Sequence, residues 1–261
     1  MAGARAYQTE AIVLRARNLG EADKIVTLLT TGRGKIDAVA KGVRRTKSHF
    51  GARLELLSVN ALMLHRGRNL DVITSAELVR SHWEALVDPA AFATAHLFAE
   101  LVDAFCEHDL PVPEVYLLLA DATAALARAA EPSALVARFE LRLLYELGIA
   151  VPGDACVRCG RTLDDGAWLD LDSPGLACEA CRRGRGAVVE LQPHDLAHFR
   201  VYGGPRGHAA PATAATAALG LAADALVTHH LGKRAKSLPA IDDLRAQVRR
   251  DADRRGRACP T

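Results

Sequence analysis

Four cysteines define the most specific chemistry in this chain. Cys156 and Cys159 form one C-x2-C knuckle, and Cys178 and Cys181 form a second knuckle after 18 intervening residues. Each knuckle can present two thiolates to one cation from a tight turn, and two knuckles together complete a tetrahedral Zn2+ shell. Because four thiolates leave no open position for water or substrate, the pattern predicts one structural Zn2+ rather than a catalytic ion.

The alternative for these cysteines is a pair of disulfides or a redox-active C-x2-C. The paired spacing favours a metal site. The two remaining cysteines, Cys106 in an apolar helical pattern and Cys259 at a polar terminus, do not suggest a secreted disulfide framework. The segment between the knuckles is rich in turn-forming residues and has few large apolar groups. We therefore expect bound metal to supply much of the order of residues 153–185.

A second candidate site is a run of basic residues in positions 41–53. No acidic residue occurs between Asp37 and Glu55. Cations this close together repel one another, which favours a bound polyanion as their partner. A solvated surface loop is the alternative interpretation. The cations of this run are Lys41, Arg44, Arg45, Lys47 and Arg53.

The basic run lies in a chain whose charge is unevenly distributed. The formal net charge is only +2, but residues 1–82 hold 14 basic and 7 acidic residues. Residues 83–230 hold 10 basic and 20 acidic residues, and residues 231–261 hold 9 and 4. A polyanion is therefore expected to meet the two ends of the chain rather than its middle.

The elements that must position the basic run are strands. Five segments of residues 1–82 are rich in β-branched and apolar residues, with an irregular insertion between the third and the fourth. This pattern suits a small closed barrel of the oligonucleotide/oligosaccharide-binding (OB) kind, although other small barrels fit it too. Because only Tyr7 and Phe50 are aromatic in this part, binding is expected to run through phosphates rather than stacked bases. The expected strands are 10–17, 23–30, 35–41, 54–65 and 71–79.

Beyond Trp83 the apolar period changes from two to about 3.6, which predicts helices. The sequence thus predicts an α+β multidomain protein, with an N-terminal five-stranded barrel, of the OB-fold or another small kind, and a C-terminal α-helical domain carrying an inserted four-cysteine zinc finger. The expected helices are 90–108, 113–130, 133–147, 192–201, 212–231 and 239–255. The expected domains are the barrel with the basic run (1–82), the first part of the helical domain (83–152), the zinc module (153–185) and the second helical part with a basic C-terminal segment (186–261).

No motif in the chain indicates an enzyme, so no catalytic residue is predicted. His194 and His198 are spaced i, i+4 but lack the glutamate of a zinc protease motif, and we interpret them as surface histidines. The glycines around Lys35 do not complete a phosphate-binding loop. No apolar run approaches the ~18 residues of a membrane span, and the N-terminus lacks a signal peptide pattern, so a cytoplasmic protein is expected.

Several segments resemble the RecO family of bacterial DNA repair and recombination mediators. They are TEAIVLR at 9–15, GEADKIVTLLT at 20–30, AVAKGVRR at 38–45 and FGARLE at 50–55. The resemblance continues through Gly148, the four cysteines and HLGKRAKS at 230–237, and so covers essentially the whole chain.

The resemblance implies non-enzymatic work on DNA. A member of this family is expected to bind single- and double-stranded DNA, to anneal complementary strands and to engage the C-terminal tail of single-stranded DNA-binding protein. It is also expected to act with RecR in loading RecA, with RecF as a further candidate partner, in the bacterial cytoplasm at the nucleoid. An RNA-binding OB protein of the translation apparatus and a structural adaptor stay open, since phosphate contacts do not distinguish DNA from RNA. The implied DNA contacts are Lys24, Lys35, Lys41, Arg44, Arg45 and Arg53, together with Lys47 of the basic run, and a second group of Lys233, Arg234 and Lys236.

Overall fold

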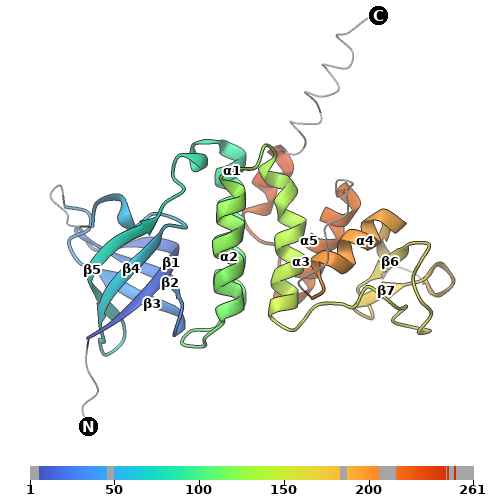
Figure 1. The fold of residues 1–261 in the computed structure, drawn as a ribbon, viewed down its shortest axis with the longest axis horizontal. Helices are drawn as coiled ribbons and strands as arrows, with labels where there is room; N and C mark the ends of the chain where they lie inside the picture. Colours follow the sequence, from blue (N-terminus) through green and yellow to red (C-terminus); the bar gives the residue numbers. More distant parts are fainter. Residues whose placement is uncertain are drawn as a thin grey trace, which may run out of the picture. The chain divides into compact units, whose positions relative to one another are not determined.

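Five strands of the N-terminal part close into a barrel (Figure 1). The strand order is β1-β2-β3-β5-β4, with β1 also paired to β4 and with β3 and β5 as the parallel pair. This is the topology of the OB fold, so the predicted fold class is confirmed. The strands are β1 (Ala6–Leu19), β2 (Asp23–Thr30), β3 (Gly34–Ala40), β4 (Val59–His65) and β5 (Asp71–Arg80).

The structure is a computed structural model that describes residues 6–45, 50–182, 187–205, 216–244, 246 and 250. Its contacts divide the chain into two units. The first unit is Met1–Ser133 with Lys236–Thr261, and the second is Ala134–Ala235. No helix among the described residues is long and apolar enough to cross a membrane.

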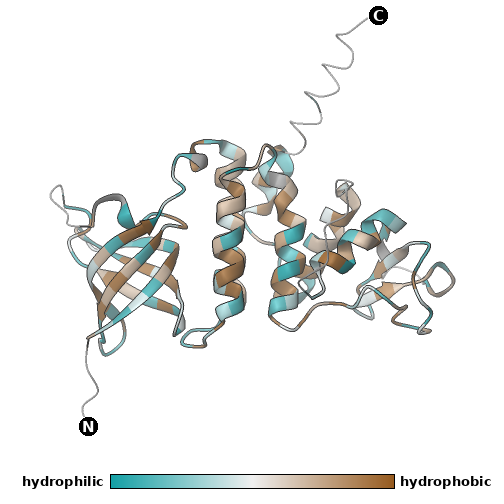
Figure 2. Cartoon of the chain, in the orientation of Figure 1, coloured by the Kyte–Doolittle hydropathy of each residue, from teal (hydrophilic) through white to brown (hydrophobic). Residues whose placement is uncertain are grey.

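The inside of the barrel is filled by alternate residues of each strand, because successive side chains of a strand point to opposite faces. In β3, Ile36, Ala38 and Ala40 join the buried core, as the sequence pattern predicts. Figure 2 shows the resulting alternation of apolar and polar residues along the strands.

The outer face of β2 is also buried. Ile25, Thr27 and Leu29 alternate with the inward residues of β2, yet all three are buried. Two helices of the same unit, α1 (Pro89–Phe105) and α2 (Pro113–Leu126), pack beside the barrel, and α1 contacts β1. The β2 part of the face of strands 2 and 3, which many OB folds use for ligands, is therefore covered here, whereas Asp37 and Val39 of β3 are half-buried.

Gly34 is where the segment after α1 approaches the barrel most closely. Its φ is +68°, and a Cβ atom built on it would lie 1.8 Å from the carbonyl oxygen of Leu110. The backbone of Asp109 also donates to the carbonyl of Lys35, at 2.9 Å. Only glycine tolerates both the left-handed conformation and this contact.

We therefore expect Gly34→Ala to lower the free energy of unfolding by about 3 kcal/mol or more, since both strain and a backbone clash oppose the methyl group. Gly32→Ala is the matched control in the same turn, because nothing lies within 4 Å of its Cβ position. Chemical denaturation measures both variants. Equal stability of the two would contradict the close approach.

The second unit combines three helices with a small sheet. They are α3 (Leu135–Glu146), α4 (Pro193–Tyr202) and α5 (Ala217–Leu231), with β6 (Ala167–Asp170), β7 (Gly175–Ala177) and β8 (Ala187–Leu191) in the order β7-β6-β8. The sequence pattern indicates only turns in the segment between the cysteine knuckles. There, Leu163, Leu169 and Leu176 are fully buried and give the module an apolar core of its own.

The helix ends follow local signals. Gly148 follows α3 with a φ of +73°, and its N–H donates to the carbonyl of Tyr145, as expected for a helix-ending glycine. The side chain of Thr216 caps α5, so this helix begins later than the predicted 212, and residues 212–215 lie outside the described part. The last predicted helix is described in part, over residues 238–244.

Candidate nucleic-acid interface and metal centre

Two loops that are distant in sequence meet at one end of the barrel. The backbone N–H of Arg44 donates to the carbonyl of Ala22, and its guanidinium donates to the carbonyl of Gly20, both at 3.0 Å. The N–H of Gly42 donates to the carboxylate of Asp23 at 2.7 Å. These bonds hold the start of the basic run against the β1–β2 turn. Because the side chain of Arg44 bonds to a neutral carbonyl, its charge is not cancelled.

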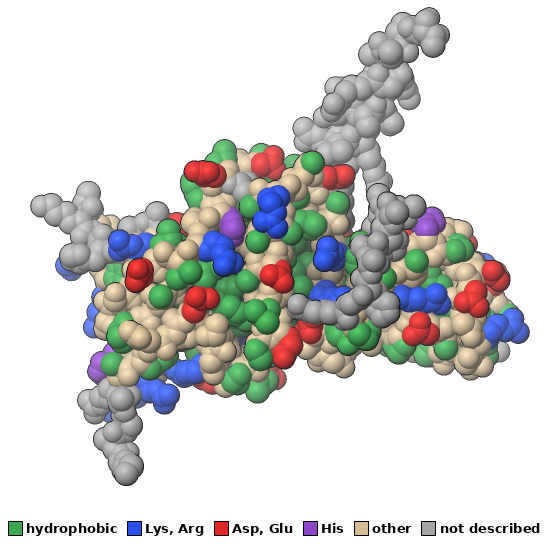
Figure 3. Space-filling model, viewed as in Figure 1, with side chains coloured by type: hydrophobic (Ala, Val, Ile, Leu, Met, Phe, Trp, Pro, Cys, Tyr) green, Lys and Arg blue, Asp and Glu red, His purple; other side chains and the backbone are tan. Residues whose placement is uncertain are grey.

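Three of the predicted basic contacts lie exposed at this end of the barrel. Lys41, Arg44 and Arg45 are exposed in the loop after β3, and Lys24 is half-buried at the start of β2. Within the described residues, no carboxylate forms an ion pair with any of these four side chains. Figure 3 shows Lys and Arg side chains along the margin of the barrel. Arg53 is exposed on the short 3-10 helix η1 (Gly51–Leu54), and Lys47 lies outside the described residues.

Lys35 does not belong to this surface, and its prediction as a DNA contact is corrected. Its side chain is buried, and its ammonium group lies 2.5 Å from the carbonyl of Asp103 and 3.3 Å from the Asp103 carboxylate. The same carboxylate pairs with Arg15 at 3.1 Å. The ion pairs of Lys35 and Arg15 with Asp103 thus connect α1 to the barrel, and Lys35 does not face a ligand.

Arg33 is likewise paired with carboxylates inside the protein. Its guanidinium donates to the carboxylate of Asp71 at 2.7 Å, and Tyr7 donates to the same carboxylate oxygen at 2.5 Å. Burial, together with the neighbouring Asp71, raises the pKa of Tyr7 to about 12. Burial alone would raise the pKa of Asp71, but the hydrogen bonds from Tyr7 and Arg33 lower it. Arg33 also pairs with Asp109, so its charge is used within the protein.

The predicted C-terminal basic group lies in the turn after α5. Gly232 ends α5 with a φ of +67°, and Lys233, Arg234 and Lys236 are exposed beyond it. Glu100 of α1 accepts hydrogen bonds from the N–H groups of Lys236 and Ser237 and from the Ser237 hydroxyl, at 2.7 to 2.9 Å. Burial alone would raise the pKa of Glu100, but these hydrogen bonds lower it.

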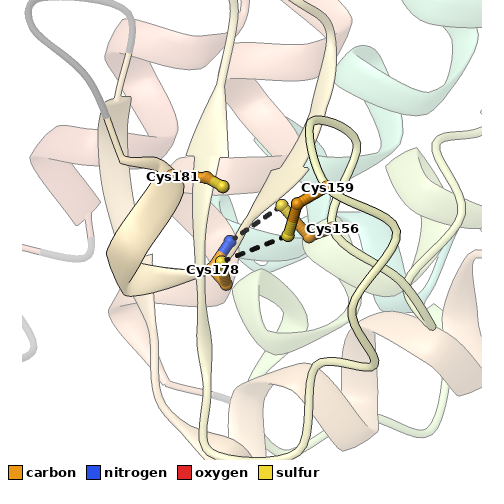
Figure 4. Close-up of side chains that lie close together, drawn as sticks. All are labelled: Cys156, Cys159, Cys178 and Cys181. Atoms are coloured by element: carbon orange, nitrogen blue, oxygen red, sulfur yellow. Dashed lines mark hydrogen bonds between the residues drawn. The ribbon is translucent and has the colours of Figure 1, made fainter.

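The four cysteines come together in the second unit as the spacing predicts. Their Sγ atoms all lie within 4.8 Å of one another (Figure 4). The Sγ atoms of Cys159 and Cys178 are 3.8 Å apart. A tetrahedral ion with metal–sulfur bonds of about 2.3 Å requires edges of about 3.8 Å, so the donor set fits one closed four-coordinate site.

The electrostatics of the cluster also suit a cation. Burial opposes ionisation of Cys156, but backbone N–H groups, first that of Cys178, lower its pKa to about 6. Hydrogen bonds with Cys159 and Cys178 raise the pKa of Cys181 to about 12. Four thiolates this close are therefore disfavoured unless a positive ion offsets their charge. The cluster can hold a metal ion.

The surface of the cysteine module is acidic among its described residues. Arg158 donates to the fully buried Asp170 at 2.5 Å, and the guanidinium of Arg182 lies 4.1 Å from the centre of the Trp168 ring. These two cations are thus used within the module, whereas Arg161 is exposed; Arg183 and Arg185 lie outside the described residues. The exposed carboxylates are those of Asp154, Asp164, Asp165, Asp172, Glu179 and Glu190.

The two histidines at i, i+4 do not form a surface pair. His194 is exposed, but His198 is only 1% exposed and its Nδ1 lies 3.1 Å from the Tyr202 hydroxyl. The prediction of a surface position was therefore wrong for His198, because α4 turns this side chain into the unit. It acts as a packed polar group.

Sequence reasoning missed further exposed arginines at the ends of the strands. Arg17 lies in the outer part of β1, Arg66 and Arg68 flank the β4–β5 turn, and Arg80 ends β5. The sequence signal that could have identified these arginines is a basic residue next to a turn at the end of a predicted strand.

The fold and the two sites define an OB-fold protein with an exposed cationic loop and a separate four-cysteine module. Residues 1–82 match the family described as "Recombination protein O N terminal", and residues 86–239 match "Recombination protein O C terminal". The chain therefore belongs to the RecO family of DNA repair and recombination proteins.

Curated relatives agree with this assignment. The chain is 43% identical over 178 residues to the DNA repair protein RecO of Bifidobacterium longum, which covers 67% of this chain and 73% of the relative. It is 40% identical over 181 residues to the DNA repair protein RecO of a Nocardioides species, which covers 67% and 74%.

Proposed function

We propose that this chain is a non-enzymatic recombination mediator that binds single- and double-stranded DNA without strong sequence preference and anneals complementary strands. The observation that supports it most is the cationic loop at the barrel end. Lys41, Arg44 and Arg45 are exposed there without an ion-pair partner among the described residues, while Lys35 and Arg33 are neutralised internally. Cations that the protein leaves uncompensated are suited to phosphates.

Annealing follows from this charge arrangement. Two complementary strands repel each other through their phosphates, and a protein that neutralises both lowers the barrier to pairing. It must leave the base edges free to pair. A loop of lysines and arginines at the barrel end meets this requirement, because such side chains contact phosphates and leave the base edges free. The outer face of β2, part of the face that binds ligands in other OB folds, is buried.

The four-cysteine cluster, in this proposal, holds one Zn2+ that is structural. Cys156, Cys159, Cys178 and Cys181 would be its ligands, and thiolate donors at this spacing favour zinc over harder cations. The ion supplies order to the module and no reaction. The acidic surface of the module argues that it braces the second unit and does not touch DNA.

Family membership supports the choice of partners, which are part of the proposal. We propose that the protein loads RecA together with RecR on strands coated by single-stranded DNA-binding protein, whose C-terminal tail it engages, with RecF as a further partner. Lys24, Arg53 and, in the second group, Lys233, Arg234 and Lys236 are proposed as further DNA contacts, and Lys47 is proposed on sequence alone. The place of work is the bacterial cytoplasm, at the nucleoid.

The experiment that tests the proposal is strand annealing by the protein alone across a salt series. We expect annealing that is fast at low salt, and an affinity whose logarithm falls by about 0.7 per neutralised phosphate for each tenfold rise in salt. Fluorescence anisotropy with oligonucleotides of unrelated sequence measures the affinity. Binding that does not change between about 50 mM and 200 mM salt, a range over which phosphate-led binding weakens strongly, would contradict it.

The alternative is an RNA-binding OB protein of the translation apparatus. Competition between DNA and RNA of the same sequence decides between the two, since the 2′-hydroxyl is the group that differs. A clear preference for RNA would favour the alternative.

A further inference from the structure

We propose that Trp83 is a stacking platform for an unpaired base of single-stranded DNA, at the edge of the cationic end of the barrel. This inference rests on the proposed function and adds to it the form of DNA that the site prefers. The barrel itself has few aromatic residues, and Trp83, which lies outside it, would supply the base contact.

The topology brings Trp83 to the cationic end. Strands β3 and β5 are parallel, with Ala38 opposite Asp71 and Ala40 opposite Ile73. The end of β5 therefore leaves the barrel on the same side as the loop that follows β3. The 3-10 helix η1, which carries Arg53, contacts β5. Arg80 is the last residue of β5, and Trp83 follows three positions later.

Trp83 is unusually exposed for such a large apolar side chain. It is 57% exposed, whereas tryptophan is highly buried on average in folded proteins. Its backbone is nevertheless held in place, because its N–H donates to the Ser81 hydroxyl at 3.3 Å and its carbonyl accepts from Leu86 at 3.0 Å. The ring is thus presented from an ordered turn rather than a loose segment.

The charges around Trp83 suit a nucleotide. Arg80 and Arg128 are exposed and both lie close enough to His82 to influence its protonation. Burial and these two cations lower the pKa of His82, so the histidine is neutral at pH 7 and the arginines carry the local charge. Guanidinium groups near His82, the residue before the open indole, can meet the phosphates while the ring meets a base face.

This arrangement would favour single strands over duplex. The bases of a duplex are already stacked on their neighbours, whereas an unpaired base is free to stack on an indole. Stacking covers a face of the base and leaves its pairing edge open, so the contact is compatible with annealing.

The chain offers a direct spectroscopic test, since its two tryptophans are Trp83 and Trp168. In a Trp168→Phe background, Trp83 fluorescence is followed while single-stranded DNA, an abasic oligomer of equal length or a duplex is added. We expect quenching by the single strand alone. We expect Trp83→Ala to weaken single-strand binding by about 5- to 100-fold, with little change for the abasic oligomer or the duplex, and Trp83→Phe to keep most of the affinity.

The outcomes separate this inference from the function on which it rests. If the unaltered protein binds the abasic oligomer in a salt-dependent manner but Trp83→Ala does not weaken single-strand binding, stacking is rejected and the phosphate-led function stands. Equal weakening of all three ligands by Trp83→Ala also rejects it. If the abasic oligomer does not bind at all, the phosphate-led function itself fails. The fluorescence measurement needs no substitution at Trp83, so it decides the question even if Trp83→Ala does not fold.

Discussion

Reversing the charges of Arg44 and Arg45 to glutamate should weaken DNA binding for all sequences alike. Removing one phosphate interaction lowers the salt slope for a single strand by about 0.7, so removing two corresponds to about 25-fold in affinity at 0.1 M salt. Repulsion by the new carboxylates would add to this effect. Annealing should fall with binding, because both depend on neutralised phosphates. Anisotropy over a salt series measures the affinity and the slope together.

Two control variants test whether a loss of binding is caused by the position of these charges rather than by a change in net charge or in folding. Arg44→Lys with Arg45→Lys keeps both charges and should retain most of the affinity. Arg66→Glu with Arg68→Glu makes the same charge change at the β4–β5 turn, at the far end of β5 from Arg80. If this second pair weakens binding as much as the first, or if the first pair anneals normally, the cationic loop is not the binding site.

Loss of the metal should disorder the cysteine module while leaving the barrel folded. Structural zinc contributes on the order of 10 kcal/mol to such modules, whereas three buried leucines contribute about 1.5 to 3 kcal/mol each. We therefore expect Cys159→Ser with Cys178→Ser, or a strong chelator, to increase hydrogen exchange across residues 153–182. Exchange in strands β1 to β5 should not change, because they belong to the first unit. Elemental analysis should find one zinc per chain in the unaltered protein and none in the variant.

Cys259→Ser is the matched control, since it removes a thiol outside the cluster. This variant should retain the metal and the exchange pattern. Unchanged exchange in the module after complete removal of the metal would show that the apolar core of Leu163, Leu169 and Leu176 is sufficient and that the ion is not structural.

The predicted elements were confirmed where local pattern governs structure. The alternation in β3 and the helix stop at Gly148 depend on residues adjacent in the chain, and both appear as predicted. The sheet β7-β6-β8 was not predicted. Its strands are three to five residues long. They form because β6 pairs with both β7 and β8, and because Leu169 of β6 and Leu176 of β7 are buried.

The sequence by itself determined the four-cysteine cluster, the barrel and the basic run, because these depend on spacing and on neighbours within a few positions. Only the tertiary structure decided which cations remain available. Lys35 is neutralised by Asp103, which lies 68 residues away, and Arg33 by Asp71, 38 residues away. The burial of His198 and the exposure of Trp83 were decided in the same way, because both depend on packing that folding alone establishes. An ion pair forms between side chains that the fold brings together. A local sequence pattern therefore cannot identify the partner of a charged residue.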